Sequence, residues 1–214
     1  MGLEKYIDHT LLKPTATDQE IITLCSEAKT HHFYGVCVNG CHIPLAKKEL
    51  KDSSVKLISV IGFPLGAMST DAKIFEAQDS VKNGADEIDM VINIGWIKSH
   101  QFDLVLEEII RIKKAIGPTI LKVIIETCYL TDKEKLKACE LIAKGKADYV
   151  KTSTGFGTEG ATYDDIALMK KKVGNLLKIK ASGGIKNRET ALKYINLGVS
   201  RIGTSSGIKI IESP

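Results

Sequence analysis

Long apolar runs, basic blocks and a disulfide-type cysteine spacing are all missing from this sequence. No apolar run approaches the roughly 18 residues of a membrane-spanning helix, and the first residues lead into no apolar segment of the signal-peptide kind. The net charge is only +4, and the lysines are scattered along helical patterns, which argues against a nucleic-acid-binding surface. We therefore expect a cytoplasmic protein that binds neither nucleic acid nor membrane.

The cysteines provide no framework for a metal or for disulfides. There are five of them, an odd number, and their spacing is not that of a disulfide scaffold. Cys37 and Cys41 lie close to His42, but no second cluster completes a zinc site. We expect free thiols in a reducing compartment and no structural metal.

Short β-branched runs alternate with longer amphipathic ones along the whole chain. The predicted strands are Tyr6–Leu11, Gly35–Asn39, Val55–Ile61, Glu87–Asn93, Ile120–Glu126, Asp148–Ser153, Leu177–Ser182 and Arg201–Thr204. The predicted helices are Thr17–His31, Pro44–Leu50, Thr70–Asn83, Phe102–Ile116, Asp132–Lys144, Tyr163–Val173, Arg188–Leu197 and Ser206–Ile211. This alternation predicts a single (β/α)8 TIM barrel, an α/β fold, with residues 1–214 as one domain. A doubly wound open sheet is the alternative, but no Gly-x-Gly-x-x-Gly turn follows the first strand.

The segment over residues 147–157, ADYVKTSTGFG, places a lysine in the middle of a predicted strand. Side chains alternate across a strand, so Lys151 shares a face with Tyr149 and Ser153. A buried lysine is costly unless it has a use, and a desolvated amine that is often neutral can attack a carbonyl. The structural alternative is a lysine on an edge strand, exposed to water.

The same alternation directs several ionisable side chains into the barrel, where Val, Ile and Leu are usual. The predicted set is Asp8, Asp89, Lys122, Glu126, Lys151 and Lys180, with Lys178 on the same face as Lys180. A purely structural charge network is the alternative interpretation, but such networks seldom stabilise a fold more than apolar packing does. We therefore favour a functional site.

Two lysines on neighbouring strands suggest a specific reaction. Lys180, on the strand after that of Lys151, would lower the pKa of Lys151 by repulsion between like charges. A neutral Lys151 could then form a Schiff base with a carbonyl substrate. Asp89 would be the inward carboxylate that moves protons or orients a water molecule.

Two glycine-rich turns follow the last two strands. Lys180-Ala-Ser-Gly183-Gly184 ends one, and Gly203-Thr-Ser205-Ser206 ends the other before a short helix. In barrels of this class, phosphate commonly binds at these two loops, through backbone N–H groups and hydroxyls. We therefore predict a phosphorylated small-molecule ligand.

These motifs resemble those of the 2-deoxyribose-5-phosphate aldolases, which are class I aldolases of the (β/α)8 type. The resemblance covers most of the chain and includes IDHTLLKP at residues 7–14, VCVN at 36–39, VIGFPLG at 60–66, EIDMVIN at 87–93, KVIIET at 122–127, and KASGG at 180–184. The pairing of VKTSTGF at residues 150–156 with the later KASGG is the most specific part. The resemblance implies reversible, cofactor-free cleavage of 2-deoxy-D-ribose 5-phosphate to D-glyceraldehyde 3-phosphate and acetaldehyde, in the catabolism of deoxynucleosides and deoxyribonucleotides.

The resemblance also assigns roles to individual residues. It implies that Lys151 is the Schiff-base nucleophile, Asp89 the proton donor and acceptor, Lys180 the second lysine and Asp8 its supporting carboxylate. The substrate-binding residues that we predict are Cys37, Thr152, Ser153, Gly155, Gly183, Gly184, Gly203, Ser205 and Ser206. Some family members have a phosphate-binding lysine where this chain has Phe156, so Ser205, Ser206 and backbone amides should carry more of that binding here. A homodimer is the expected assembly, with a tetramer as the alternative.

Three other functions fit part of the pattern. A non-catalytic phosphosugar-binding barrel needs the glycine turns but not the lysine pair. Another Schiff-base aldolase or a transaldolase would share Lys151 but accept larger donor ketones. A phosphosugar isomerase needs a carboxylate base and no nucleophilic lysine.

Overall fold

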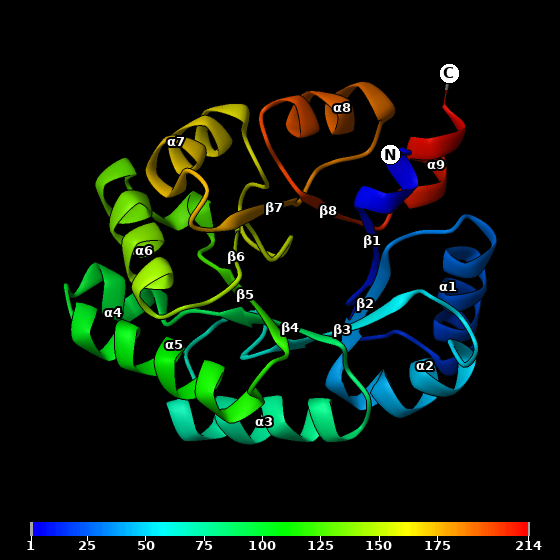
Figure 1. Ribbon diagram of the computed structural model, residues 1–214, viewed down its shortest axis with the longest axis horizontal. Helices are drawn as coiled ribbons and strands as arrows, with labels where there is room; N and C mark the ends of the chain where they lie inside the picture. Colours follow the sequence, from blue (N-terminus) through cyan, green and yellow to red (C-terminus); the bar gives the residue numbers. More distant parts are fainter. Residues whose placement is uncertain (1, 214) are drawn as a thin grey trace.

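Eight parallel strands close into a barrel in sequence order in the computed structural model, which describes residues 2–213. The strands are β1 (Ile7–Leu11), β2 (Gly35–Asn39), β3 (Lys56–Ile61), β4 (Glu87–Val91), β5 (Ile120–Ile124), β6 (Tyr149–Lys151), β7 (Lys178–Ser182) and β8 (Arg201–Thr204). Pairing of β8 with β1 completes the barrel, and the helices surround it (Figure 1). The predicted (β/α)8 fold is confirmed.

The helices follow the predicted ranges closely, with a few additional short segments. They are α1 (Asp18–Thr30), α2 (Ile43–Glu49), α3 (Thr70–Lys82), α4 (Ile94–Lys98), α5 (Phe102–Ile116), α6 (Asp132–Lys144), α7 (Tyr163–Val173), α8 (Arg188–Asn196) and α9 (Gly207–Glu212). Short 3-10 helices cover Leu3–Tyr6, Gly40–His42 and Thr127–Tyr129. Capping boxes begin α1 at Thr17, paired with Glu20, and α6 at Thr131, paired with Glu134.

The predicted fourth and fifth strands extend two residues too far. Asn93 does not continue β4, because its side-chain oxygen accepts a hydrogen bond from the Trp96 N–H at 3.1 Å and caps the unpredicted helix α4. Glu126 lies two residues beyond the end of β5 and has a φ of 49°, in the left-handed region. β4 therefore ends where Asn93 caps a helix, and β5 ends just before a residue in the left-handed conformation.

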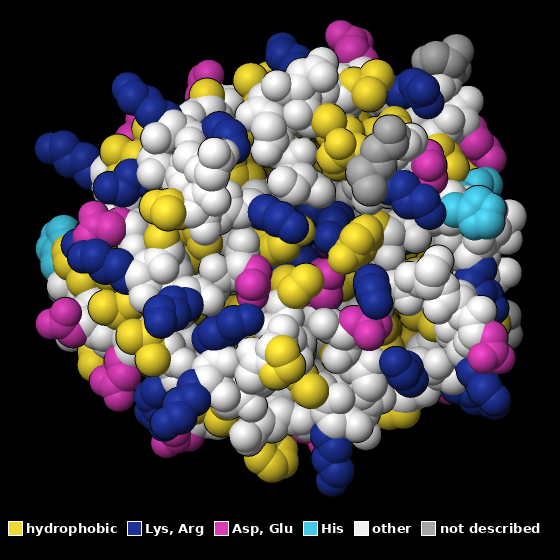
Figure 2. Space-filling model, viewed as in Figure 1, with side chains coloured by type: hydrophobic (Ala, Val, Ile, Leu, Met, Phe, Trp, Pro, Cys, Tyr) yellow, Lys and Arg dark blue, Asp and Glu magenta, His cyan; other side chains and the backbone are white. Residues whose placement is uncertain are grey.

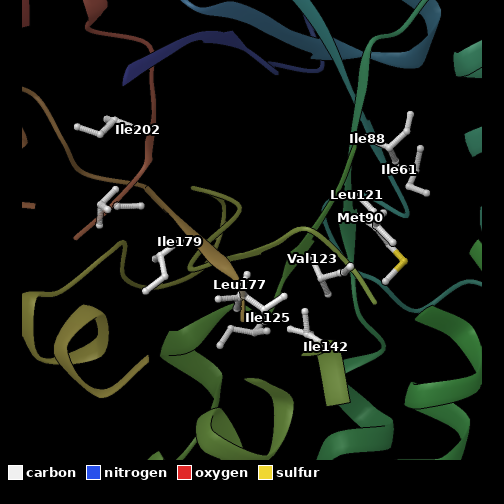
Figure 3. Packing of buried hydrophobic residues seen from close by; sticks show 14 of the residues in the cluster. Ile61, Ile88, Met90, Leu121, Val123, Ile125, Ile142, Leu177, Ile179 and Ile202 are labelled. Carbon is white, nitrogen blue, oxygen red and sulfur yellow. The ribbon is translucent and has the colours of Figure 1, made fainter. Parts of the chain in front are cut away.

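The main hydrophobic core lies between the strands and the helices rather than inside the barrel. Ile88 and Met90 of β4, and Leu121 and Val123 of β5, point outward into this layer (Figure 3). A smaller inner cluster lines the barrel beside β2 and β3, and consists of Leu12, Cys37, Ile58 and Val60, with Phe63 packed against it. The apolar packing is therefore outside the barrel and on one side of its interior, which leaves the other side for charged groups.

A buried ion pair ties α3 to α5 outside the barrel. The Lys73 Nζ lies 2.8 Å from a Glu108 oxygen, both side chains are fully buried, and the same ammonium donates to the Val91 carbonyl at 2.8 Å. We expect Lys73→Met to lower the free energy of unfolding by ~3–5 kcal/mol, because it leaves a buried carboxylate unpaired. The double variant Lys73→Met/Glu108→Leu should recover most of this loss in denaturant titrations, and equal destabilisation of the two variants would contradict the ion-pair explanation.

Among the described residues, no helix is both long and apolar enough to cross a membrane.

Candidate active site

Two lysine ammonium groups meet at one carboxylate oxygen inside the barrel. Lys151 on β6 and Lys180 on β7 are direct neighbours in the strand register. The Nζ atoms of both lie 2.8 Å from the Oδ2 atom of Asp89, which reaches them from β4. The solvent-exposed fraction of the three side chains is 3% or less, so the contacts are shielded from water. The structure thus brings together the three side chains on which the predicted chemistry depends.

Two further predicted side chains complete the surroundings of these lysines. The Lys122 Nζ binds the other oxygen of Asp89, Oδ1, at 2.6 Å. The Oδ2 atom of Asp8 lies 2.5 Å from the Nζ of Lys180. Lys180 therefore has two carboxylate partners, whereas Lys151 has a share in one.

Two more buried charged residues, Arg201 and Glu87, contact this group and were not identified from the sequence. Arg201 binds the Oδ1 atom of Asp8 at 2.9 Å and approaches Glu87 at 3.4 Å. Glu87 also pairs with Lys122 at 2.6 Å and accepts a hydrogen bond from the Tyr34 hydroxyl at 2.8 Å. Strand alternation could have revealed Glu87, which stands two residues before Asp89 on the same face of β4.

Two of the residues that were expected in the barrel lie outside this group. Glu126 accepts hydrogen bonds from the Thr154 backbone N–H at 3.1 Å and from the Thr154 hydroxyl, so it fixes the turn after β6. Lys178 begins β7 and is exposed, with its Nζ 5.6 Å from the centre of the Tyr149 ring. Both were expected on the inward face, but Lys178 is exposed at the start of β7, and Glu126 hydrogen-bonds Thr154 rather than pairing with a lysine of this group.

The two lysines differ in their affinity for a proton. Burial lowers the pKa of Lys151 below its ordinary value, and the charge of Lys180 lowers it further, against the opposing pull of Asp89. Burial acts the same way on Lys180, but Asp8 and Asp89 outweigh it and raise its pKa. The pKa of Asp89 is far below its usual range because Lys122, Lys151 and Lys180 outweigh the effect of burial. Lys151 is therefore the amine that loses its proton most readily.

A cavity of about 240 Å³ opens above Lys151 at the carboxyl ends of the strands. The predicted residues that line it are Lys151, Gly155, Gly183, Gly184, Gly203, Ser205 and Ser206. Lys13, after β1, and Lys186, after the Gly183–Gly184 turn, also line it, although the sequence did not single them out. Figure 2 shows basic and acidic side chains side by side around the middle of the face in view. The cavity therefore combines an amine at its base with backbone, hydroxyl and ammonium groups at its sides.

Three residues predicted to bind substrate lie behind the cavity wall. The Thr152 hydroxyl donates to the Ser182 carbonyl at 3.2 Å and accepts from the Ser182 N–H at 3.1 Å. Ser153 is fully buried, and its carbonyl accepts from the Ser182 hydroxyl at 2.5 Å. Cys37 belongs to the inner apolar cluster, and burial raises the pKa of its thiol. These residues therefore support the strands and the apolar packing around the cavity and do not line it.

Phe156, at the position where a lysine would bind phosphate, is half exposed and lines the cavity. Its ring contacts that of Phe63 edge to face, with 5.5 Å between the ring centres. The edge-to-face contact joins the turn after β6 to the loop after β3, so this wall of the cavity is apolar.

Comparisons with known proteins agree on one family over nearly the whole chain. The model of the DeoC/LacD family aldolases matches residues 3–212. The deoxyribose-phosphate aldolase of Mannheimia succiniciproducens is 55% identical over 210 residues, which cover 98% of this chain and 94% of the relative. That of Thermococcus gammatolerans is 54% identical, over 99% of this chain and 96% of the relative.

Solved structures give the same result. An aldolase named QR15 superposes with a TM-score of 0.95 at 42% identity, covering 98% of this chain and 94% of that one. A tetrameric deoxyribose phosphate aldolase from Aeropyrum pernix superposes with a TM-score of 0.90 at 32% identity, covering 99% and 90%.

Proposed function

The chain belongs to the DeoC/LacD family aldolases, and from that membership we infer that it is a class I aldolase that reversibly cleaves 2-deoxy-D-ribose 5-phosphate to D-glyceraldehyde 3-phosphate and acetaldehyde. The observation that carries this inference is the buried amine of Lys151, which shares one carboxylate oxygen with Lys180 at the base of the cavity. A binding protein or an isomerase would have no use for such a costly pair.

In this mechanism the neutral amine of Lys151 attacks the aldehyde carbon C1 of the open-chain sugar, and loss of water leaves an iminium. Removal of the proton from the C3 hydroxyl breaks the C2–C3 bond, and the electron pair of that bond passes into an enamine as D-glyceraldehyde 3-phosphate departs. Protonation of the enamine at C2 and hydrolysis then release acetaldehyde and restore Lys151. Asp89, which touches both amines, relays protons between Lys180 and the reacting atoms.

Borohydride trapping with 2-deoxy-D-ribose 5-phosphate, followed by peptide mass mapping, tests this function. Borohydride reduces an iminium to a stable amine, so the sugar-derived adduct should appear on the peptide that contains Lys151. An adduct on Lys180 would reverse the roles of the two lysines. If the folded protein binds the phosphosugar and forms no adduct, a binding or isomerase function would replace the aldolase.

The substrate phosphate is expected to bind at the glycine turns after β7 and β8, near Lys186. We expect Lys186→Ala to raise KM for 2-deoxy-D-ribose 5-phosphate by about 10-fold, which corresponds to one lost charge-assisted hydrogen bond. Kinetics with unphosphorylated 2-deoxyribose should stay unchanged. Lys133→Ala, an exposed lysine on α6, serves as the control. Equal losses on the two sugars would place the phosphate elsewhere.

The proposed assembly is a homodimer of chains in which residues 1–214 form one domain. Leu65 and Phe75 are large apolar side chains that are 73% and 74% exposed on the loop after β3 and on α3, and such surface favours association. Light scattering after size-exclusion chromatography would give the mass directly. A cytoplasmic location is proposed as well, because Cys25, Cys37 and Cys139 are buried free thiols.

A further inference from the structure

Six charged side chains form a closed ring of alternating sign inside the barrel. We call this set the charge ring; in order around it, its members are Asp89, Lys122, Glu87, Arg201, Asp8 and Lys180. Each member pairs with the next at 2.5–3.4 Å, and Lys180 returns to Asp89 at 2.8 Å. Three carboxylates and three cations alternate, so the ring is neutral.

Lys151 lies outside this balance. It contacts the ring only through the Oδ2 atom of Asp89. Ring ammonium groups already occupy both oxygens of that carboxylate, because Lys122 binds Oδ1 and Lys180 binds Oδ2. A protonated Lys151 would therefore add an uncompensated positive charge to a buried site, whereas a neutral Lys151 leaves the interior balanced.

We propose that Glu87 and Arg201, which do not touch Lys151, are positioning residues that keep Asp8 and Asp89 committed to the charge ring and so keep Lys151 available as the neutral nucleophile. This proposal rests on the proposed function of Lys151. It accounts for a carboxylate only 2.8 Å from the Lys151 amine in a site where burial keeps the pKa of that amine below its ordinary value.

Aromatic hydroxyl groups hold the two positioning residues in place. Tyr34 donates to the Oε1 atom of Glu87 at 2.8 Å, and its ring centre lies 3.1 Å from the guanidinium carbon of Arg201. Arg201 donates in turn to the Tyr149 hydroxyl at 3.3 Å. Glu87 and Arg201 are 1% and 3% exposed, so water screens their charges little.

Other groups around Lys151 bear on its charge as well. The Cys37 thiol approaches it from β2, Glu126 from the end of β5, and Tyr149 from its own strand, while β3 contributes the apolar side chains Ile58 and Val60. Burial raises the pKa of Cys37 and that of Glu126, which favours their neutral forms. Within the described residues, the ion pair of the Lys151 amine is with the charge ring, through Asp89.

The proposal is tested by removing one negative or one positive charge from the charge ring, because the two changes should shift the pH dependence of activity in opposite directions. In Glu87→Gln the ring gains a net positive charge, so the acidic limb of the pH dependence of kcat/KM should move to lower pH by about one pH unit. In Arg201→Met the ring gains a net negative charge, so the limb should move about as far to higher pH. The conservative variant Arg201→Lys should keep the wild-type limb.

The double variant Glu87→Gln/Arg201→Met restores a neutral ring and should return the limb toward its wild-type position. The control is Lys73→Met/Glu108→Leu, which removes a buried ion pair outside the barrel and should leave the limb in place. If Arg201→Met does not fold, the pH profiles of Glu87→Gln and Arg201→Lys are compared instead. Glu87→Gln should move the acidic limb, and Arg201→Lys should not. A limb that stays fixed, or moves the same way in both single variants, would overturn the proposal. Failure of borohydride trapping in the wild-type protein would instead overturn the aldolase function.

Discussion

Replacing Lys151 with alanine or methionine is expected to lower kcat by at least ~10⁴-fold, because the nucleophile that forms the iminium is lost and the remaining groups only bind and orient the substrate. The folded structure should survive. The pKa of Lys151 is lowered in the fold from an ordinary value near 10.5. At a pH below the ordinary pKa, the unfolded chain holds the Lys151 proton more tightly than the folded protein does, and this lowers the free energy of unfolding. Lys151→Met has no amine to protonate, so it removes this cost. Its Tm at neutral pH should therefore match or exceed that of the wild type.

Lys178→Ala is the matched control for this experiment. Lys178 stands on the neighbouring strand with the same inward parity, but its side chain is exposed at the start of β7. The control should keep its activity and Tm. A Lys151→Met enzyme with appreciable aldol cleavage would show that the iminium forms elsewhere, and unfolding of that variant would show that the amine is a structural cation.

Asp89→Asn is expected to have the second-largest effect, because it damages stability and catalysis together. At neutral pH the charged ammonium groups of Lys122 and Lys180 would face an amide in place of a carboxylate. Loss of a buried partner of this kind costs ~3–5 kcal/mol of unfolding free energy. Turnover should fall by ~10²-fold or more, as is usual when a positioned proton-transfer group is removed.

The pH dependence separates this effect from ordinary packing damage. The pKa of Asp89 is depressed in the folded protein, so its contribution to stability is present above the unfolded value near 3.8 and is lost as the pH falls through the folded value. The difference in unfolding free energy between the wild type and Asp89→Asn should therefore be constant near neutrality and shrink below about pH 4. A difference that persists unchanged into acid would indicate a packing effect.

Much of this site follows from the alternation of side chains along a strand. Lys151, Lys180 and Asp89 were predicted to face inward because Val150, Ile179 and Met90 take the outer face, and the structure places them so. In a closed barrel, the inward-facing side chains of one strand lie beside the inward-facing side chains of the next strand. The pairing of Lys151 with Lys180 is an example.

The partners of these residues could not be predicted in the same way. Whether Asp8 meets Arg201 depends on how far β8 is staggered against β1 when the barrel closes, and the alternation within either strand does not give that stagger. The residue at which a strand ends could not be predicted from side-chain alternation either. Glu126 has the pattern of a strand residue, and only its hydrogen bonds to Thr154, a distant part of the chain, explain why the strand stops.

The bond between the first and the last strand also bears on how the chain folds during synthesis. Asp8 lies on β1, and its guanidinium partner Arg201 lies on β8, near the other end of the chain. A nascent chain that has not yet released β8 would have to bury Asp8 and Glu87 without the cation that they share, at a cost comparable to breaking a buried ion pair. Until β8 joins, Asp8 and Glu87 have only Lys180 and Lys122 as cationic partners, so we expect closure of the barrel to complete the neutralisation of these carboxylates.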